Sequence, residues 1–315
     1  MLSFESVALR ARGIIAPAAL GLFVAIFVFP GPLPGVLFSP QAHAHGVVGQ
    51  RKFIEPFVTE DVNPKDEFVV ARPEWDNSRE GHVLSYGFGL EKKLSDDLSI
   101  TLDSEWLRIS PSDPDEPNKS GFNSLGISLK YAFFKSPDRE AIASFAVEAG
   151  APTGTADVGA EEDWAFRPFF LYGKGFGDLP DGLEYLRPFA VQGDFGPEVS
   201  AGPGTAMAFA HNICLQYSIL YLQAVVKDLG LGWPFNSLVA VTEFNFEHGL
   251  RGEKKGINNI TTTPGIVYMG RYVELGVAGR FPLTGSAHDE LDSGVIFIVD
   301  LFLDDILPAS NRQLF

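Results

Sequence analysis

The sequence predicts an all-β protein, an antiparallel up-and-down transmembrane β-barrel of about twelve strands that is preceded by a signal peptide. Apolar and polar side chains alternate along many short segments, so that Leu98, Ile100 and Leu102 share one face of a strand. These segments follow an N-terminal export signal, and no second apolar run is long enough to cross a bilayer as a helix. A chain of this kind can be integral to a membrane only through its strands.

Composition agrees with strands and narrows the function classes. The chain contains 33 Gly, 27 Phe and 3 Met among 315 residues, which favours strands with aromatic outer faces over a helical protein. Its formal net charge of −16 would repel the phosphates of nucleic acids, so we expect no nucleic-acid partner. The single cysteine, Cys214, excludes an internal disulfide and a cysteine zinc cluster, and we interpret it as an ordinary structural position.

The N-terminus has the features of a targeting segment. Arg10 and Arg12 precede an apolar run over residues 14–29, which is too short for a membrane span but suits the core of a signal peptide. Ala42 and Ala44 fill the small-residue positions of a cleavage site, which would make His45 the mature N-terminus. An uncleaved anchor is the alternative, and in both cases the protein leaves the cytoplasm.

Residues 1–44 are therefore expected to be the signal peptide, 45–66 a periplasmic N-terminal tail, 67–303 the outer-membrane barrel and 304–315 a C-terminal tail. The first strand candidate, 67–75, is interrupted by Pro73. The other candidates are 84–91, 98–109, 122–134, 141–150, 166–176, 186–195, 211–226, 237–247, 260–269, 272–280 and 293–303. An even number of strands is the rule for bacterial single-chain barrels.

The spacers between these candidates give the barrel a direction. Connections after the even-numbered strands are short, whereas those after the odd-numbered strands from the third onward are longer and rich in Pro, Gly, Asp and Glu. Residues 110–120, 151–163 and 281–292 are examples of the longer kind. The pattern predicts short turns on the periplasmic side and long loops outside, and it predicts that both termini lie in the periplasm.

The polar face of each strand is expected to point into the lumen. The charged candidates that this rule places inside are Glu91, Asp103, Glu105, Lys130, Glu148, Asp194, Glu243, Glu247, Glu274 and Arg280. An excess of carboxylates would favour cations in an open channel. Alternatively, these carboxylates pair with Lys130, Arg167 and Arg280 and fill a narrow, closed barrel, since twelve strands lie between the filled and the open barrel sizes.

Motifs for chemistry are scarce. His211, His248 and His288 lie near predicted outer strand ends, with Ser200, Ser286 and Asp289 nearby, but no motif selects a catalytic set, so we do not predict an enzyme. The other local signal is His43-Ala44-His45, because cleavage at Ala44 would expose an amino group and an imidazole at His45 that could chelate copper. Otherwise we expect no cofactor, and these histidines would simply flank the cleavage site.

Three segments resemble a known family. Residues His45–Phe53, Tyr172–Pro180 and Leu186–Gly193 are similar to an uncharacterised family of exported proteobacterial proteins that are taken to be outer-membrane β-barrels. More distantly, the chain is similar to the porin-like transporters named for the phenol meta-degradation pathway. The resemblance implies the fold and an outer-membrane location in a Gram-negative bacterium, but it supplies no substrate and no catalytic residues.

The sequence therefore predicts a porin-like channel or transporter for small, cationic solutes. There are two alternatives. One is a non-conducting barrel with a structural or binding role at the cell surface, and the other is a metal-handling protein that uses His45. The expected partners are outer-membrane lipid, the barrel-assembly machinery and a small-molecule solute. Neither the solute nor the oligomeric state follows from the residues.

Overall fold

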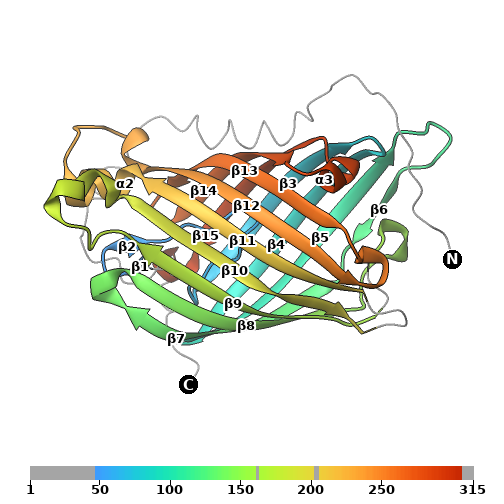
Figure 1. Ribbon diagram of the computed structural model, residues 1–315, viewed down its shortest axis with the longest axis horizontal. Helices are drawn as coiled ribbons and strands as arrows, with labels where there is room; N and C mark the ends of the chain where they lie inside the picture. Colours follow the sequence, from blue (N-terminus) through green and yellow to red (C-terminus); the bar gives the residue numbers. More distant parts are fainter. Residues whose placement is uncertain (1–46, 161–162, 202–205, 307–315) are drawn as a thin grey trace.

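Twelve strands close into one antiparallel barrel (Figure 1). The computed structural model describes residues 47–160, 163–201 and 206–306. The barrel closes where the first wall strand pairs with the last one, with Trp75 opposite Val295. The wall strands are β3 (Glu67–Ser78), β4 (Gly81–Ser95), β5 (Leu98–Pro111), β7 (Leu125–Ser136), β8 (Ala141–Ala151), β9 (Ala165–Gly175), β10 (Phe189–Ser200), β11 (Met207–Ser218), β12 (Leu238–Arg251), β13 (Asn258–Met269), β14 (Val273–Pro282) and β15 (Ser293–Phe302). The short strand β6 (Lys119–Phe122) pairs with the C-terminal half of β5.

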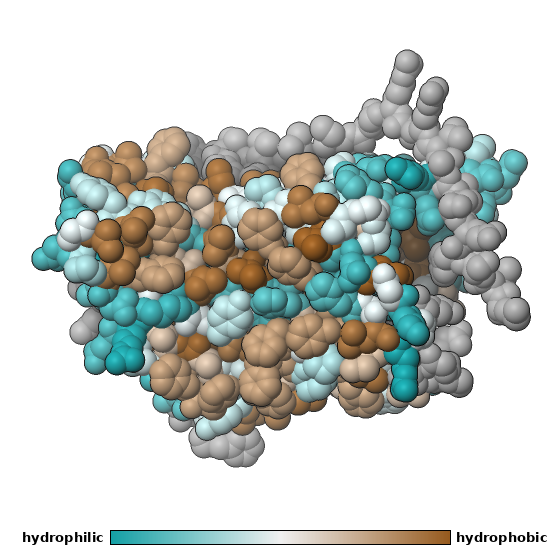
Figure 2. All heavy atoms as spheres, viewed as in Figure 1, coloured by the Kyte–Doolittle hydropathy of each residue, from teal (hydrophilic) through white to brown (hydrophobic). Residues whose placement is uncertain are grey.

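The alternation of side chains separates an outer from an inner face. On β7, Leu129, Tyr131 and Phe133 are exposed on the outside, whereas Lys130 and Ala132 are buried inside. Figure 2 shows apolar residues spread over the barrel wall. A β-barrel that crosses a membrane requires an apolar outer belt, so the predicted fold class is confirmed. No helix within the described residues is both long enough and apolar enough to cross a membrane.

We call the end at which β3 begins and β15 ends the basal end, and the opposite end the distal end. The basal connections hold the 3-10 helices η1 (Pro137–Arg139), η3 (Asp181–Leu186) and η5 (Phe235–Ser237), the single α-helical turn α2 (Ile219–Tyr221) and the π-helix η4 (Leu222–Val226). The distal connections hold η2 (Ala156–Val158), η6 (Gly252–Lys254) and the helix α3 (Gly285–Glu290). A last short helix, α4 (Leu303–Ile306), follows β15 at the basal end.

Two sequence-based expectations about these connections are wrong. The lengths do not alternate strictly, because residues 176–188 and 219–237 form long basal connections while β3 and β4 are joined by a tight distal turn. The eighth strand also ends earlier than expected, at Ser218 rather than near Val226. The Ser218 hydroxyl accepts a hydrogen bond from the Tyr221 amide at 3.0 Å and so caps a helical turn. The apolar sequence of this segment gives no sign of the turn.

The segment before the first wall strand enters the barrel. β1 (Val47–Val48) and β2 (Arg51–Lys52) form a two-stranded hairpin at the basal end, and the chain then runs inside the wall until β3 begins. Residues 51–66, which we call the lumen segment, are buried except for Lys52, Val58 and Glu60, which are partly buried. The expectation of a periplasmic tail over 45–66 is therefore wrong for this segment, which lies in the lumen.

Several expectations fall on residues that the structure does not describe. The signal peptide, its cleavage site, His43 and the proposed copper ligand His45 lie outside the described residues, as do residues 307–315 of the expected C-terminal tail. Cleavage at Ala44 and copper binding at His45 stay predictions.

Candidate functional site

The lumen segment is held chiefly through its backbone, and Glu243 of β12 binds three consecutive amides of it. The Glu243 carboxylate accepts hydrogen bonds from the amides of Phe57, Val58 and Thr59 at 2.6, 3.1 and 2.7 Å. It also accepts the Thr59 hydroxyl at 2.8 Å. Charge-assisted bonds of this kind are stronger than neutral ones, and they satisfy amides that would otherwise be unpaired inside the barrel.

Three further wall carboxylates act in the same way. The Asp194 carboxylate on β10 accepts a hydrogen bond from the Glu60 amide at 3.0 Å. Glu274 on β14 accepts the amide of Glu55 at 2.9 Å, and Glu91 on β4 accepts the amide of Lys65 at 3.1 Å. Acidic groups from four separate strands therefore serve as acceptors for one irregular segment, and much of the acidic interior is occupied with this task.

Lys65 supplies the opposite charge inside the segment. Its ammonium lies 2.5 Å from Asp61, 2.8 Å from Glu67 and 3.0 Å from Glu55, and all four side chains are buried. Burial by itself lowers the pKa of Lys65, but the three carboxylates raise it well above its ordinary value. The side chain therefore stays charged. It links Glu55 and Asp61 of the lumen segment to Glu67 at the start of β3.

The apolar side chains of the segment complete two clusters inside the barrel. Ile54 and Phe57 pack into a buried cluster on one side of the lumen, and Phe53 and Val62 into another. The wall members of the first cluster are Cys214, Val239, Val241, Val267, Met269, Ala278, Ile296 and Ile298. Those of the second are Ala132, Ile142, Ala146, Phe169, Leu171 and Ala190, together with Val48 from the basal hairpin.

Inward-facing glycines make room for the aromatic rings. A Cβ on Gly276 would lie 2.8 Å from the Phe57 ring, and one on Gly265 would lie 2.9 Å from the same ring. A Cβ on Gly173 would lie 3.1 Å from the Phe53 ring. Real Cβ atoms do not approach to less than 3.0 Å, so Gly276 accepts the Phe57 ring only as glycine unless the ring moves. A Cβ on Gly265 would also lie 2.6 Å from the Cβ of Ala278, and the contact at Gly173 would be tight.

A buried cluster at the basal end fixes the start of the segment. The Arg51 guanidinium lies 3.3 Å from the Glu140 carboxylate and donates to the backbone carbonyls of Arg187 and Pro188. It also lies 3.9 Å above the centre of the Tyr221 ring, whose hydroxyl donates to Glu140 at 2.9 Å. Burial lowers the pKa of Arg51 and, with Glu140, raises that of Tyr221 to about 12. Three basal turns thus converge on one residue.

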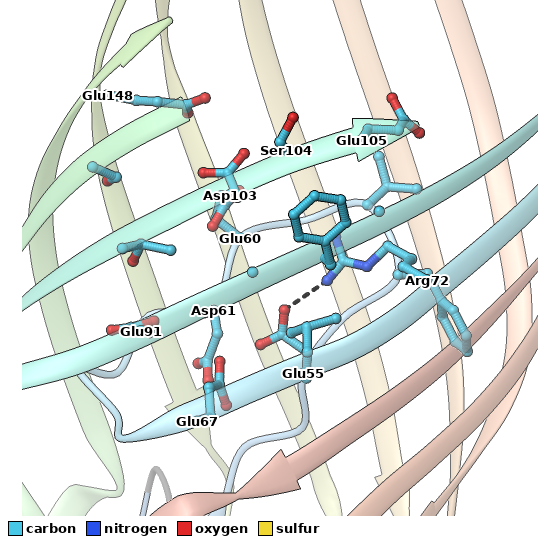
Figure 3. A pocket seen from close by; sticks show the side chains of 18 of the residues that line it. Glu55, Glu60, Asp61, Glu67, Arg72, Glu91, Asp103, Ser104, Glu105 and Glu148 are labelled. Carbon is cyan, nitrogen blue, oxygen red and sulfur yellow. Dashed lines mark hydrogen bonds and ion pairs between the residues drawn. The ribbon is translucent and has the colours of Figure 1, made fainter. Parts of the chain in front are cut away.

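A cavity of about 380 Å³ remains between the lumen segment and strands β3, β4, β5, β7, β8 and β14. Its acidic lining residues are Glu55, Glu60, Asp61, Glu67, Glu74, Glu91, Asp103, Glu105 and Glu148, and its basic ones are Arg72, Lys130 and Arg280. Figure 3 shows Glu60 of the lumen segment close to Asp103 of β5, with Glu105 and Glu148 nearby. Arg72 donates to Glu55 at 2.8 Å, which ties the wall to the segment.

The residues predicted to line the lumen separate into two groups. Glu91, Asp194, Glu243 and Glu274 bind the lumen segment, and so does Lys130, which lies 3.1 Å from Glu91 and bonds the carbonyl of Asn63 at 3.4 Å. The second group faces the remaining space or the distal mouth, and its members are Asp103, Glu105, Glu148, Glu247 and Arg280.

Members of the second group differ in their partners. Arg280 bridges Glu74 and Asp76, and Glu247 pairs with Lys254 at 2.8 Å. Glu148 lies 3.6 Å from Arg167, which also pairs with Asp194. Asp103 and Glu105 line the cavity and form no ion pair in the described part of the chain.

The histidines and serines considered for chemistry do not form a catalytic set in the described residues. His211 stacks against Phe246 on the outer face of the barrel. His248 shares a 2.7 Å hydrogen bond with the Asn258 side chain, whereas the Ser286 hydroxyl donates to the Asn258 carbonyl. No group of three or more His, Cys, Asp or Glu side chains among the described residues is placed to hold a metal ion.

Sequence reasoning missed the lumen segment itself, although two signals pointed to it. Residues 53–62 carry Phe53, Ile54, Phe57, Val58 and Val62, which are unusual in a solvated tail. In addition, the basal ends of β12 and β13 are apolar on both faces, as in Val239 and Val241. A strand that is apolar on its inner face needs something inside the barrel to cover it.

No protein-family model matches the sequence, and a search of curated proteins found no match. Among solved structures, the fold is similar to that of an outer-membrane channel from Pseudomonas putida F1, with a TM-score of 0.54 and 11% identity over 79% of this chain and 99% of that one. Two porins are less similar. The NanC porin has a TM-score of 0.47 and 7% identity over 74% of this chain and 98% of that one. The KdgM porin has a TM-score of 0.43 and 10% identity over 75% of this chain and 98% of that one. The family resemblance of the sequence stays a prediction. The chain has the twelve-stranded barrel fold of bacterial outer-membrane channels, with its own N-terminal segment inside the lumen.

Proposed function

We propose that the barrel lies in the outer membrane with its basal end toward the periplasm and is a narrow diffusion channel for small cationic solutes. The lumen segment restricts the passage, and the cavity beside it is the remaining path. The observation that carries the proposal is the cavity lining, in which nine carboxylates face three basic side chains.

The charge argument depends on the carboxylates that have no basic partner. Asp103 and Glu105 line the cavity without an ion pair in the described part of the chain, and Glu60 reaches the same space from the lumen segment. Gly126 opposite Asp103 leaves room for its carboxylate, since a Cβ there would lie 2.5 Å from an Asp103 oxygen. A cation entering this space gains attraction that an anion lacks, which produces selectivity even where the passage is narrow.

Single-channel recording in planar bilayers tests the proposal. We expect small conductance steps with a preference for K⁺ over Cl⁻. One unit charge about 5 Å from an ion in water contributes about 0.8 kcal/mol. The charge attracts K⁺ and repels Cl⁻ equally, so we expect Asp103→Asn or Glu105→Gln to lower the K⁺/Cl⁻ permeability ratio by a factor of up to about fifteen, and less at high salt because of screening.

Asp157→Asn is the matched control, because Asp157 is an exposed carboxylate at the distal end that does not line the cavity. It should leave the ratio unchanged. A folded barrel that never conducts, even when the lumen segment is loosened by substitution, would be evidence against a channel and in favour of a binding or structural barrel.

A further inference from the structure

Large apolar side chains are exposed on two basal connections. Trp233 and Phe235 are 65% and 61% exposed, and they follow helix η4 in the longest basal connection. Together with their neighbours they form what we call the basal patch: Leu183, Tyr185, Leu186, Val225, Leu229, Leu231, Trp233 and Phe235. In Figure 2, apolar residues gather at this end over the region where Figure 1 draws α2 and the loop after it.

The patch belongs to a connection with a defined shape. The Gln223 side chain donates to the carbonyl of Leu231 at 2.9 Å and accepts the amide of the same residue at 3.1 Å. Asp228 accepts the amide of Gly230 at 2.8 Å, which closes the turn between them. The apolar side chains are therefore presented by a folded excursion of the chain.

Hydrogen bonds direct this excursion to the outer side of the wall. The Trp233 indole donates at 3.0 Å to the hydroxyl of Tyr268, which follows the outward-facing Ile266 by two residues on β13. The Tyr217 hydroxyl donates at 3.3 Å to the carbonyl of Tyr185, and Tyr217 pairs ring to ring with the exposed Phe189. The basal patch is thus continuous with the apolar belt of the barrel.

Basic groups lie beside tyrosine rings at this end of the barrel. The Lys227 ammonium donates to the Tyr185 hydroxyl at 3.2 Å and lies 5.9 Å from the centre of that ring. The Arg271 guanidinium lies 5.1 Å from the centre of the neighbouring Tyr272 ring. Amphipathic rings with Lys or Arg beside them are typical of segments that lie in the interface of a bilayer and attract anionic headgroups.

We propose that the basal patch is embedded in the periplasmic leaflet of the outer membrane and binds anionic phospholipid there, with Lys227 and Arg271 on the headgroup phosphates. Continuity with the lipid-facing belt and the two cations favour phospholipid over a periplasmic protein. The inference rests on the membrane location in the proposed function, but it does not depend on conduction.

The four tryptophans make the proposal testable. Trp75, Trp106 and Trp164 lie near the distal end, so replacing all three with Phe leaves Trp233 as the only indole fluorophore. This variant is placed in vesicles of phosphatidylcholine with or without phosphatidylglycerol, with bromine on the acyl chains of one lipid at a time. We expect strong quenching of Trp233 by brominated lipid, weak quenching by acrylamide, and stronger quenching by brominated phosphatidylglycerol than by its phosphatidylcholine counterpart.

Two charge variants provide the internal comparison. Lys227→Gln with Arg271→Gln should remove the preference for phosphatidylglycerol, whereas Lys119→Gln with Arg251→Gln at the distal end should leave it intact. Heat-modifiable migration establishes that each variant forms a folded barrel. The proposal would be overturned if brominated lipid does not quench Trp233 emission and acrylamide does. The patch would then be exposed to water, and a protein partner could bind it.

Discussion

The Arg51 guanidinium fixes the lumen segment to three basal turns, and its removal should loosen that segment. Arg51→Ala would leave the buried Glu140 carboxylate without its cation and the carbonyls of Arg187 and Pro188 without a donor. Removing one partner of a buried ion pair typically costs about 3 kcal/mol. We expect larger and noisier single-channel conductance, because the segment would leave the lumen for part of the time.

Arg139→Ala is the control for this experiment, since Arg139 is exposed on the same turn as Glu140. Its conductance should match that of the wild type. An Arg51→Ala channel with wild-type conductance would show that the basal cluster does not hold the segment. Glu140 adopts a φ of 47°, which is costly for a non-glycine residue, and its three side-chain contacts account for its presence there.

The glycines of β13 and β14 determine whether Phe57 can stay inside the barrel. Gly276→Leu would place a side chain where the Phe57 ring lies, and overpacking of this kind costs about 1–3 kcal/mol. Because the wall is closed by its hydrogen bonds, we expect the lumen segment to move instead of the strand, with a higher open-state conductance in planar bilayers.

Gly182→Leu serves as the comparison, because nothing lies within 4 Å of a Cβ built on Gly182 in a basal turn. It should conduct like the wild type. If Gly276→Leu forms a folded barrel that also conducts like the wild type, Phe57 does not limit the passage.

The strands could be predicted from the sequence, but their interior could not. The alternation along residues 84–91 and 98–109 marks β4 and β5 because one face meets lipid and the other a polar lumen. The same rule placed Glu243 inside but could not name its partners, since Phe57 lies 186 positions earlier in the chain. No local pattern encodes such a contact.

The remaining errors have the same origin. The run over residues 219–226 is apolar without a period of two, and the capping by Ser218 decides for a helix. Residues 45–66 show no strand pattern, which favours a tail, although apolar side chains of this segment pack against inward-facing apolar residues of β12 and β15. Only the closed wall brings those surfaces together.

The molecule as a whole is a barrel whose acidic interior mostly binds its own N-terminal segment and leaves one acidic cavity beside it. The native Cys214 reports on this arrangement, because its thiol is fully buried in the cluster that Ile54 and Phe57 complete. With an empty lumen, the same thiol would face water.

The most direct test is therefore the rate at which a water-soluble maleimide labels Cys214 in the folded, membrane-inserted protein. We predict labelling at least tenfold slower, about 1.4 kcal/mol, than that of a cysteine facing the cavity, Glu105→Cys in a Cys214→Ser background. We also predict that Arg51→Ala accelerates the labelling of Cys214. Wild-type Cys214 that reacts as fast as the cavity cysteine would contradict the central claim, because the lumen segment would then not occupy the barrel.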